Sequence, residues 1–229
     1  YFNREWDKGI GAFEKALEQT RAEVDDIADN SESPTFENTV VALDYAGYQL
    51  ERISSIFFNL NSAETNKEIQ SLAQEISPML AAFGNDITLN ESLFKRIQAV
   101  YEQVDRESMT PEQQMLLDRK FRHFRRNGAL LSESDKKRLR QIDAELSRLK
   151  LTFGEHVLEE TQKFALHLTE EEDLEGLPES AREAARILAK SRDKEGWVFT
   201  LDYPSYLPFM KYADKRELRK QMALAFGSR

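Results

Sequence analysis

Apolar residues separated by alternating steps of three and four are the feature that most constrains this chain. Such spacing places side chains on one face of an α-helix, because the helix turns once in about 3.6 residues. Two long stripes follow this rule: Leu43, Ala46, Leu50, Ile53, Phe57 and Leu60 form the first, and Leu139, Ile142, Leu146, Leu149 and Phe153 form the second. We expect helices that bury these stripes, at 43–60 and at 139–153, in a mainly helical fold.

Capping residues divide the first part of the chain into further helices. Side-chain oxygens at a helix start accept hydrogen bonds from the first free backbone N–H groups. On this basis helix starts are predicted at Ser33-Pro34, Thr65-x-x-Glu68, Asn90, Thr110-Pro111 and Ser132-x-x-Asp135, and helix ends at Gly84 and at Asn127-Gly128. The two helices that meet at Asn127-Gly128 are expected to fold back antiparallel on each other.

Near residue 162 the apolar spacing changes from helical to alternating. Phe164, Leu166 and Leu168 alternate with polar or small residues, as do Trp197, Phe199 and Leu201, and a period of two predicts β-strands, here near 163–169 and 197–202. A helix over 179–192 separates them. Pro204 and Pro208 are expected to break the chain after the second strand, and Asp214-x-x-Glu217 to cap a last helix. The sequence therefore predicts a mainly α fold: an antiparallel helical bundle over 1–160 and a small α+β appendage over 161–229.

Composition excludes several classes of protein. The chain has 229 residues, a formal net charge of −9 and no cysteine, which excludes disulfides, thiolate metal sites and cysteine nucleophiles. The sequence has no run of about 18 apolar residues, the length that a membrane-spanning helix requires. The negative net charge disfavours nucleic-acid binding. The first six residues lack the basic and apolar regions of a signal peptide. We expect a cytoplasmic location, or a periplasmic one if a signal lies upstream.

A search for catalytic motifs finds none. A zinc peptidase helix requires His-Glu-x-x-His, and a di-metal bundle requires Glu-x-x-His. The three histidines, His123, His156 and His167, satisfy neither spacing. The nucleophile motif Gly-x-Ser-x-Gly and the glycine-rich phosphate-binding motifs are also missing. The sequence therefore predicts no catalytic, cofactor-binding or metal-binding residue.

Each histidine has a functional and a structural interpretation. His156 and Glu160 share a helix face and could form a weak metal site, but a surface histidine among acids is the preferred interpretation. His123 lies among Arg122, Arg125 and Arg126, which indicates a solvated basic face. His167 falls on the polar side of a predicted strand, which favours exposure.

Residues 119–150 carry an excess of positive charge. The segment has a local charge of +7, so the remainder of the chain carries −16. Its cations are Arg119, Lys120, Arg122, Arg125, Arg126, Lys136, Lys137, Arg138, Arg140, Arg148 and Lys150. Two interpretations stay open: a docking face for an acidic partner or a peptide carboxylate, and the solvated outer face of two helices.

Several motifs, in order, resemble one family. Ser33-Pro34-Thr35-Phe36-Glu37-Asn38-Thr39 followed by Ala42-Leu43 is similar to a signature near the start of the thimet oligopeptidase family of zinc metallopeptidases. Further landmarks are Phe57–Leu60, Ile76–Pro78, Asn90–Phe94, Phe124–Ala129, Leu174–Pro178 and Gly196–Tyr206. The resemblance covers essentially the whole chain, and its bacterial peptidyl-dipeptidase (dipeptidyl carboxypeptidase) and oligopeptidase A branches are the most similar.

The resemblance implies a mainly helical, two-lobed enzyme with a deep substrate channel. The family's zinc ligands, general base and transition-state donors lie downstream of the matched region, so none is assigned here. It implies that this chain is the N-terminal lobe, a non-catalytic channel wall. Zinc and the catalytic lobe would belong to the parent polypeptide, which would cleave short peptides and release C-terminal dipeptides.

A freestanding interaction module that docks an acidic partner on 119–150 is the alternative. The last helix looks cut at Arg229. We therefore expect some of Met222, Leu224 and Phe226 to lack cover and to promote self-association.

Overall fold

The computed structural model describes residues 7–229, with side chains from residue 10, and these residues form two compact units. The first unit ends at Leu151, and the second runs from Thr152 to Arg229. Each unit has its own apolar core. The sequence predicts a division between a helical bundle and an α+β appendage at 160/161. The two units divide instead between Leu151 and Thr152, within a helix that continues without a break from the first unit into the second.

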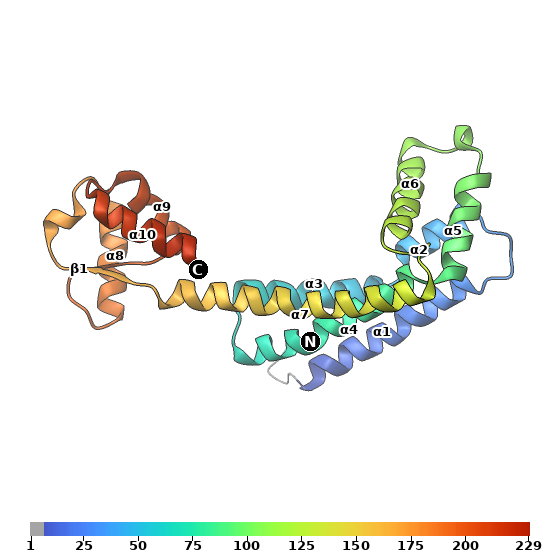
Figure 1. The fold of residues 1–229 in the computed structure, drawn as a ribbon, viewed down its shortest axis with the longest axis horizontal. Helices are drawn as coiled ribbons and strands as arrows, with labels where there is room; N and C mark the ends of the chain where they lie inside the picture. Colours follow the sequence, from blue (N-terminus) through green and yellow to red (C-terminus); the bar gives the residue numbers. More distant parts are fainter. Residues whose placement is uncertain (1–6) are drawn as a thin grey trace. The chain divides into compact units, whose positions relative to one another are not determined.

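The first unit is entirely helical among its described residues (Figure 1). Its elements are α1 (Asp7–Ala28), the π-helical turn η1 (Phe36–Val41), α2 (Ala42–Tyr45), α3 (Tyr48–Ala63), α4 (Lys67–Thr88), α5 (Glu91–Gln103), the short 3₁₀ turn η2 (Arg106–Ser108), α6 (Pro111–Arg126) and the first part of α7 (Glu133–Lys163). Phe13, Phe57 and Ile76 lie in a core between α1, α3 and α4. Leu93, Ile97 and Phe124 lie in a second core that joins α5 to α6.

The second unit contains a small antiparallel sheet. Strands β1 (Leu166–Leu168) and β2 (Trp197–Phe199) pair with Leu166 opposite Phe199 and Leu168 opposite Trp197. The helical elements are η3 (Glu171–Leu174), α8 (Glu179–Ser191), α9 (Tyr203–Tyr212) and α10 (Arg216–Ser228), together with the end of α7. The predicted mainly α fold with two short strands is therefore confirmed.

Local capping chemistry placed some helix starts correctly. Asn90 accepts a hydrogen bond from the backbone N–H of Leu93 and caps α5, and Thr110 forms a capping box with Gln113 at the start of α6. α7 starts after Ser132, whose hydroxyl accepts from the N–H of Asp135.

Other predicted boundaries were wrong. Thr35, rather than Ser33-Pro34, caps η1, because its hydroxyl and the Asn38 side chain form the capping box. Asn66, rather than Thr65, caps α4, because its side chain reaches the N–H of Ile69. α4 also passes through Gly84 and ends at Thr88.

The predicted helix over 43–60 is interrupted at Gly47. Gly47 adopts φ +79°, a left-handed conformation that glycine tolerates and other residues rarely adopt. Its N–H donates to Glu23 Oε2 at 2.8 Å, which ties the turn to α1. The stripe nevertheless packs inward on both sides of the break, because Leu43, Leu50 and Phe57 are buried.

The prediction that the 139–153 stripe is buried was wrong. The side chains of Ile142, Leu146, Leu149 and Phe153 are 39%, 43%, 54% and 69% exposed. α7 uses the opposite face for its contacts, where Arg140 pairs with Asp86 of α4 at 2.7 Å and Leu151 packs against the first core. Periodicity identifies an apolar face, but it does not say which neighbouring element covers it.

The antiparallel pairing predicted for α6 and α7 was also wrong. α6 ends at Asn127-Gly128 as expected. However, it packs beside α5 and stands at a steep angle to the first part of α7 (Figure 1). The aromatic rings of Phe94, Phe121 and Tyr101 stack between α5 and α6, and this contact fixes the direction of α6.

Two corrections concern the second unit. Pro204 and Pro208 do not break the chain but lie within α9, Pro204 at its first turn, where a proline N–H is not needed. α10 begins at Arg216 and has no side-chain cap, so Asp214 does not serve as one. Of the three apolar residues near the end, Met222 is buried, Phe226 stacks on Tyr206, and Leu224 is 65% exposed.

Candidate functional site

A hollow of about 810 Å³ lies between α2 and α6 of the first unit. We call it the α2–α6 hollow. It is lined by Asp44 of α2 and by one face of α6: Pro111, Glu112, Met115, Leu116, Arg119, Lys120 and His123. The opposite face of α6 carries Leu117 and Phe124, which are fully or almost fully buried. The buried face therefore anchors the helix and leaves the other face open to a ligand.

Charge is distributed unevenly along this face of α6. Glu112 lies in the first turn, and Arg119 lies two turns further along. Hydrogen bonds from its own backbone N–H and from the Thr110 hydroxyl lower the pKa of Glu112 below its usual value, so this carboxylate is negative at neutral pH. The hollow consequently has a negative end at Glu112 and a positive end at Arg119.

The two cationic side chains at the positive end, Lys120 and Arg119, differ in their partners. Lys120 pairs with Asp44, with Nζ 2.9 Å from Oδ1, which neutralises its charge locally and joins α6 to α2. Arg119 is exposed and, within the part of the chain that the structure describes, makes no hydrogen bond or ion pair. Its guanidinium group is therefore available to an anionic ligand.

His123 adds a neutral hydrogen-bond donor at the same end. Burial, followed by the nearby charge of Lys120, lowers its pKa below the usual value. The amide nitrogen Nδ2 of Asn127 lies 3.1 Å from Nδ1 of His123, and an amide nitrogen can only donate. Nδ1 therefore accepts, and the neutral ring carries its proton on Nε2.

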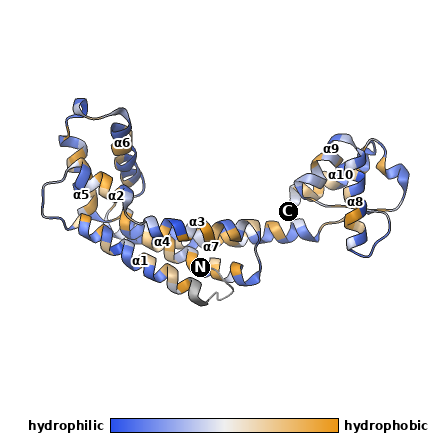
Figure 2. Cartoon of the chain, turned by 180° about the vertical axis from the view of Figure 1, so that it is seen from behind, coloured by the Kyte–Doolittle hydropathy of each residue, from blue (hydrophilic) through white to orange (hydrophobic). Residues whose placement is uncertain are grey.

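Between the two charged ends the surface is apolar. Met115 is 56% exposed, and Leu116 lies next to it on the wall of the hollow. Figure 2 shows this mixture of hydrophilic and hydrophobic residues along α6. An open surface with apolar residues flanked by opposite charges can hold a short peptide, whose own charges lie at its ends.

The sequence did not single out Glu112, Met115 or Asp44 as site residues. Glu112, Met115, Arg119 and His123 recur at steps of three or four, opposite Leu117 and Phe124. This second stripe on the same helix was the available signal. Asp44 could not be found in this way, because it comes from a different helix.

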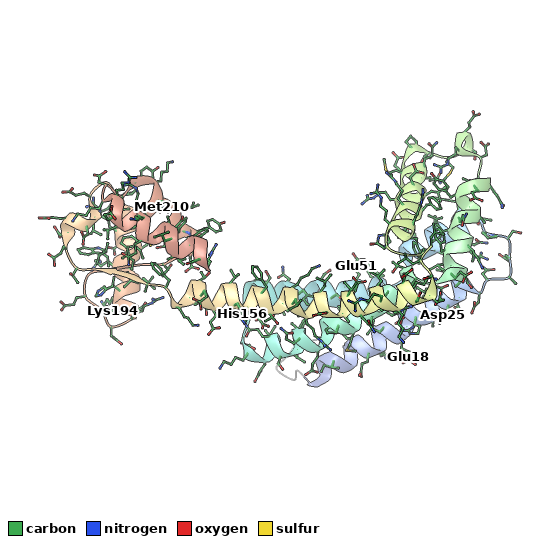
Figure 3. The ribbon with its side chains drawn as sticks, viewed as in Figure 1. Glu18, Asp25, Glu51, His156, Lys194 and Met210 are labelled. Atoms are coloured by element: carbon green, nitrogen blue, oxygen red, sulfur yellow. The ribbon has the colours of Figure 1, made fainter. Side chains whose placement is uncertain are left out.

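The remaining histidines lie apart from the hollow. His156 is exposed on α7 (Figure 3), and its predicted partner Glu160 is exposed as well. His167 is exposed, with Nε2 2.6 Å from the backbone oxygen of Glu195. Among the described residues no group of three His, Asp or Glu side chains could hold a metal ion.

The cations of 119–150 do not form one continuous basic face. Lys136 is 5% exposed and pairs with Glu133, and Arg140 pairs with Asp86. The hydrogen bond of Arg122 goes to a backbone oxygen on its own helix. Only part of the excess charge is therefore free for a ligand, and Arg119 at the hollow belongs to that part.

The segment 33–39 is a structural element that joins α5 to the start of η1. Asn38 accepts from the N–H of Thr35 at 2.8 Å, donates to the carbonyl oxygen of Ser33 at 3.0 Å, and accepts from Arg96 of α5 at 3.2 Å. These contacts explain why Thr and Asn occur at this spacing.

No helix in the described range 7–229 is both long enough and apolar enough to cross a membrane.

Comparison with known proteins finds that this chain is similar to several peptidases. It is 32% identical over 219 residues to the dipeptidyl carboxypeptidase of Salmonella typhimurium, and this alignment covers 95% of the present chain and 32% of the Salmonella protein. It is 30% identical over 220 residues to the oligopeptidase A of Escherichia coli, which covers 96% of this chain and 32% of that protein. An organellar oligopeptidase A of Arabidopsis thaliana is 27% identical over 220 residues, which covers 93% of this chain and 28% of that protein.

The chain thus spans about a third of the length of the curated relatives it matches. No protein-family model matches it. Two kinds of peptidase each align with almost the whole chain, so the chain is similar over nearly its full length to one part of the peptidases of the thimet oligopeptidase family.

Proposed function

We propose that this chain forms a wall of the substrate channel in a zinc peptidase that removes C-terminal dipeptides from short peptides or otherwise cleaves them. The observation that carries the proposal is the match of 95–96% of the chain to dipeptidyl carboxypeptidase and oligopeptidase A relatives. The chain's part is steric and binding: it narrows access and contacts the peptide, while the bonds are cleaved elsewhere in the longer protein.

The donor set of the described residues does not fit a zinc ion, since no three candidate ligands lie together. We therefore propose that zinc, the general base and the other catalytic groups belong to a catalytic lobe of the same polypeptide, outside these residues. We propose a cytoplasmic location, supported by a relative in Arabidopsis thaliana that is named as a probable cytosolic oligopeptidase A.

The test compares two proteins. The chain alone and a longer protein that contains it together with a catalytic lobe are incubated with a peptide of about ten residues, and products are identified by mass spectrometry. We expect the longer protein to release dipeptides or internal fragments, to be inhibited by a chelator, and to leave a folded protein intact. We expect no cleavage by the chain alone. Chelator-sensitive cleavage by the chain alone, or no cleavage by the longer protein, would contradict the proposal.

The alternative, a freestanding module that docks an acidic partner on 119–150, has weaker support. Lys120, Lys136 and Arg140 already have acidic partners within the chain. A pull-down with a polyglutamate peptide separates the two: the alternative requires retention that depends on Arg125 and Arg126, which lie outside the α2–α6 hollow.

A further inference from the structure

We infer that the α2–α6 hollow binds a short peptide by its two charged ends, with the free carboxylate at Arg119 and His123 and the ammonium group at Glu112. This inference deepens the proposed function, on which it rests for the assumption that peptides are the ligands. The occupant is defined by chemistry: a peptide of three or four residues with both termini free and an apolar residue between them.

The spacing of the charges along α6 sets the length of this peptide. Glu112 and Arg119 are seven positions apart, and a helix rises about 1.5 Å per residue, so their backbones are separated by about 10 Å along the axis. An extended peptide spans about 3.3–3.6 Å per residue. Three residues therefore bridge the two groups, and a fourth residue brings the carboxylate closer to His123.

Each end of the hollow has a group suited to its role. Arg119 offers a planar guanidinium group without a partner in the described chain, which matches the geometry of a carboxylate. His123 presents an N–H at Nε2, because Asn127 occupies Nδ1. At the other end Glu112 is an exposed carboxylate that can accept from an ammonium group.

The central part favours an apolar side chain over a third charge. Met115 is more than half exposed and flexible, which allows it to adapt to side chains of different shapes. Lys120 and Asp44 satisfy each other beside it and leave no net charge there. An anion alone would use only one end of the hollow, whereas a peptide with two free termini uses both.

The inference is tested by binding measurements on the chain with three related peptides. Ala-Leu-Ala with free termini, its C-terminal amide and its N-acetyl form are titrated into the ¹⁵N-labelled chain, and chemical-shift changes are followed by NMR. We expect the free peptide to shift resonances of α2 and α6. Each blocked peptide should bind about two- to fivefold more weakly, the range expected for loss of an exposed charge pair.

Paired substitutions assign each terminus to its side chain. Arg119→Gln should weaken binding of the free peptide about two- to fivefold, yet leave the affinity of the amide unchanged, because the amide has no carboxylate to pair with Arg119. Glu112→Gln should weaken binding of the free peptide to the same extent and leave the affinity of the N-acetyl peptide unchanged. Arg125→Gln is the matched control, since Arg125 is also an exposed arginine of α6 without a partner among residues 10–229, but does not line the hollow.

Three results would overturn the inference: equal affinity for the free and amidated peptides, equal effects of Arg119→Gln and Arg125→Gln, or shifts confined to residues outside α2 and α6. Its failure is distinguishable from failure of the proposed function. If the longer protein cleaves peptides but the chain does not bind them, the result contradicts only the assignment of the hollow as a binding site. If the chain binds the free peptide in the hollow but the longer protein cleaves nothing, the result contradicts the peptidase function and supports the binding site.

Discussion

Arg96 provides the sharpest test of how the first unit is held together. This arginine of α5 is only 7% exposed. Its Nη1 donates to the carbonyl oxygens of Asn30 at 2.6 Å and Glu32 at 3.0 Å, and its Nη2 donates to Asn38 Oδ1 at 3.2 Å and Thr39 Oγ1 at 3.3 Å. Its Nε is buried and has no hydrogen-bond partner in the described part of the chain. One guanidinium group thus fixes the connection between α1 and η1.

The structure indicates the size of the effect of Arg96→Met, which keeps much of the apolar stem and removes the donors. Hydrogen bonds from a charged donor contribute about 1.5–3 kcal/mol each when they are well formed. Counting the two shorter bonds fully and the two longer ones weakly gives about 4 kcal/mol. Rehydration of the Asn30 and Glu32 carbonyls and removal of the unpartnered Nε return about 1 kcal/mol. We expect a loss of about 3 kcal/mol in the free energy of unfolding.

The assay is urea unfolding monitored by far-ultraviolet circular dichroism, with Trp197 fluorescence recorded in a Trp6→Phe background as a separate report on the second unit. Arg96→Met should lower the midpoint of the first unit's transition by about 1–2 M urea and leave the Trp197 transition in place. Arg96→Lys should give a midpoint between those of Arg96→Met and the unsubstituted chain, because one ammonium group cannot reach all four acceptors. Lys95→Ala is the control, since Lys95 is exposed and forms a surface ion pair with Glu91. An Arg96→Met protein as stable as the control would refute the reasoning.

Four further outcomes are expected. Leu146→Ala should lower the free energy of unfolding by less than about 1 kcal/mol because its side chain is 43% exposed, whereas Met222→Ala, fully buried, should lower it by about 2–4 kcal/mol; urea unfolding distinguishes the two. Gly47→Ala should cost about 1–2 kcal/mol, measured in the same way, because φ is +79° and the new Cβ would lie 2.9 Å from Thr20 Cγ2. An NMR titration should place the pKa of His123 below 6.5. The unfolded chain then takes up this proton first, so the contribution of His123 to stability is present above pH 6.5 and is lost as the pH falls through the lowered pKa.

Local chemistry explains which parts of the fold the sequence predicted. Asn90 and Thr110 cap helices through bonds to residues three positions away, so their role is visible in a short stretch of sequence. The strands were found because Leu166 and Phe199 lie on alternating apolar patterns. Gly47 was missed because an apolar stripe continues on both sides of the turn.

Features that depend on distant partners were not predicted. The exposure of Leu146 follows from the pairing of Arg140 with Asp86, which lies 54 positions away in sequence. The α2–α6 hollow depends in the same way on Asp44, whose partner Lys120 lies on another helix. The sequence showed an excess of cations, but only the structure separates Arg119, which has no partner among the described residues, from Lys120, which has one.

The uninterrupted course of α7 has a consequence for the helix–coil equilibrium of its middle turns. Phe153 and Gly154 are both exposed, and among the described residues no atom outside the adjacent turns of α7 lies within 4 Å of the position that a Cβ at Gly154 would take. These turns depend on intrinsic helix propensity, which glycine lowers by about 1 kcal/mol relative to alanine. Their amide hydrogens should exchange with solvent sooner than those at either end of α7, and a protease that requires an unfolded segment should cleave the chain there first.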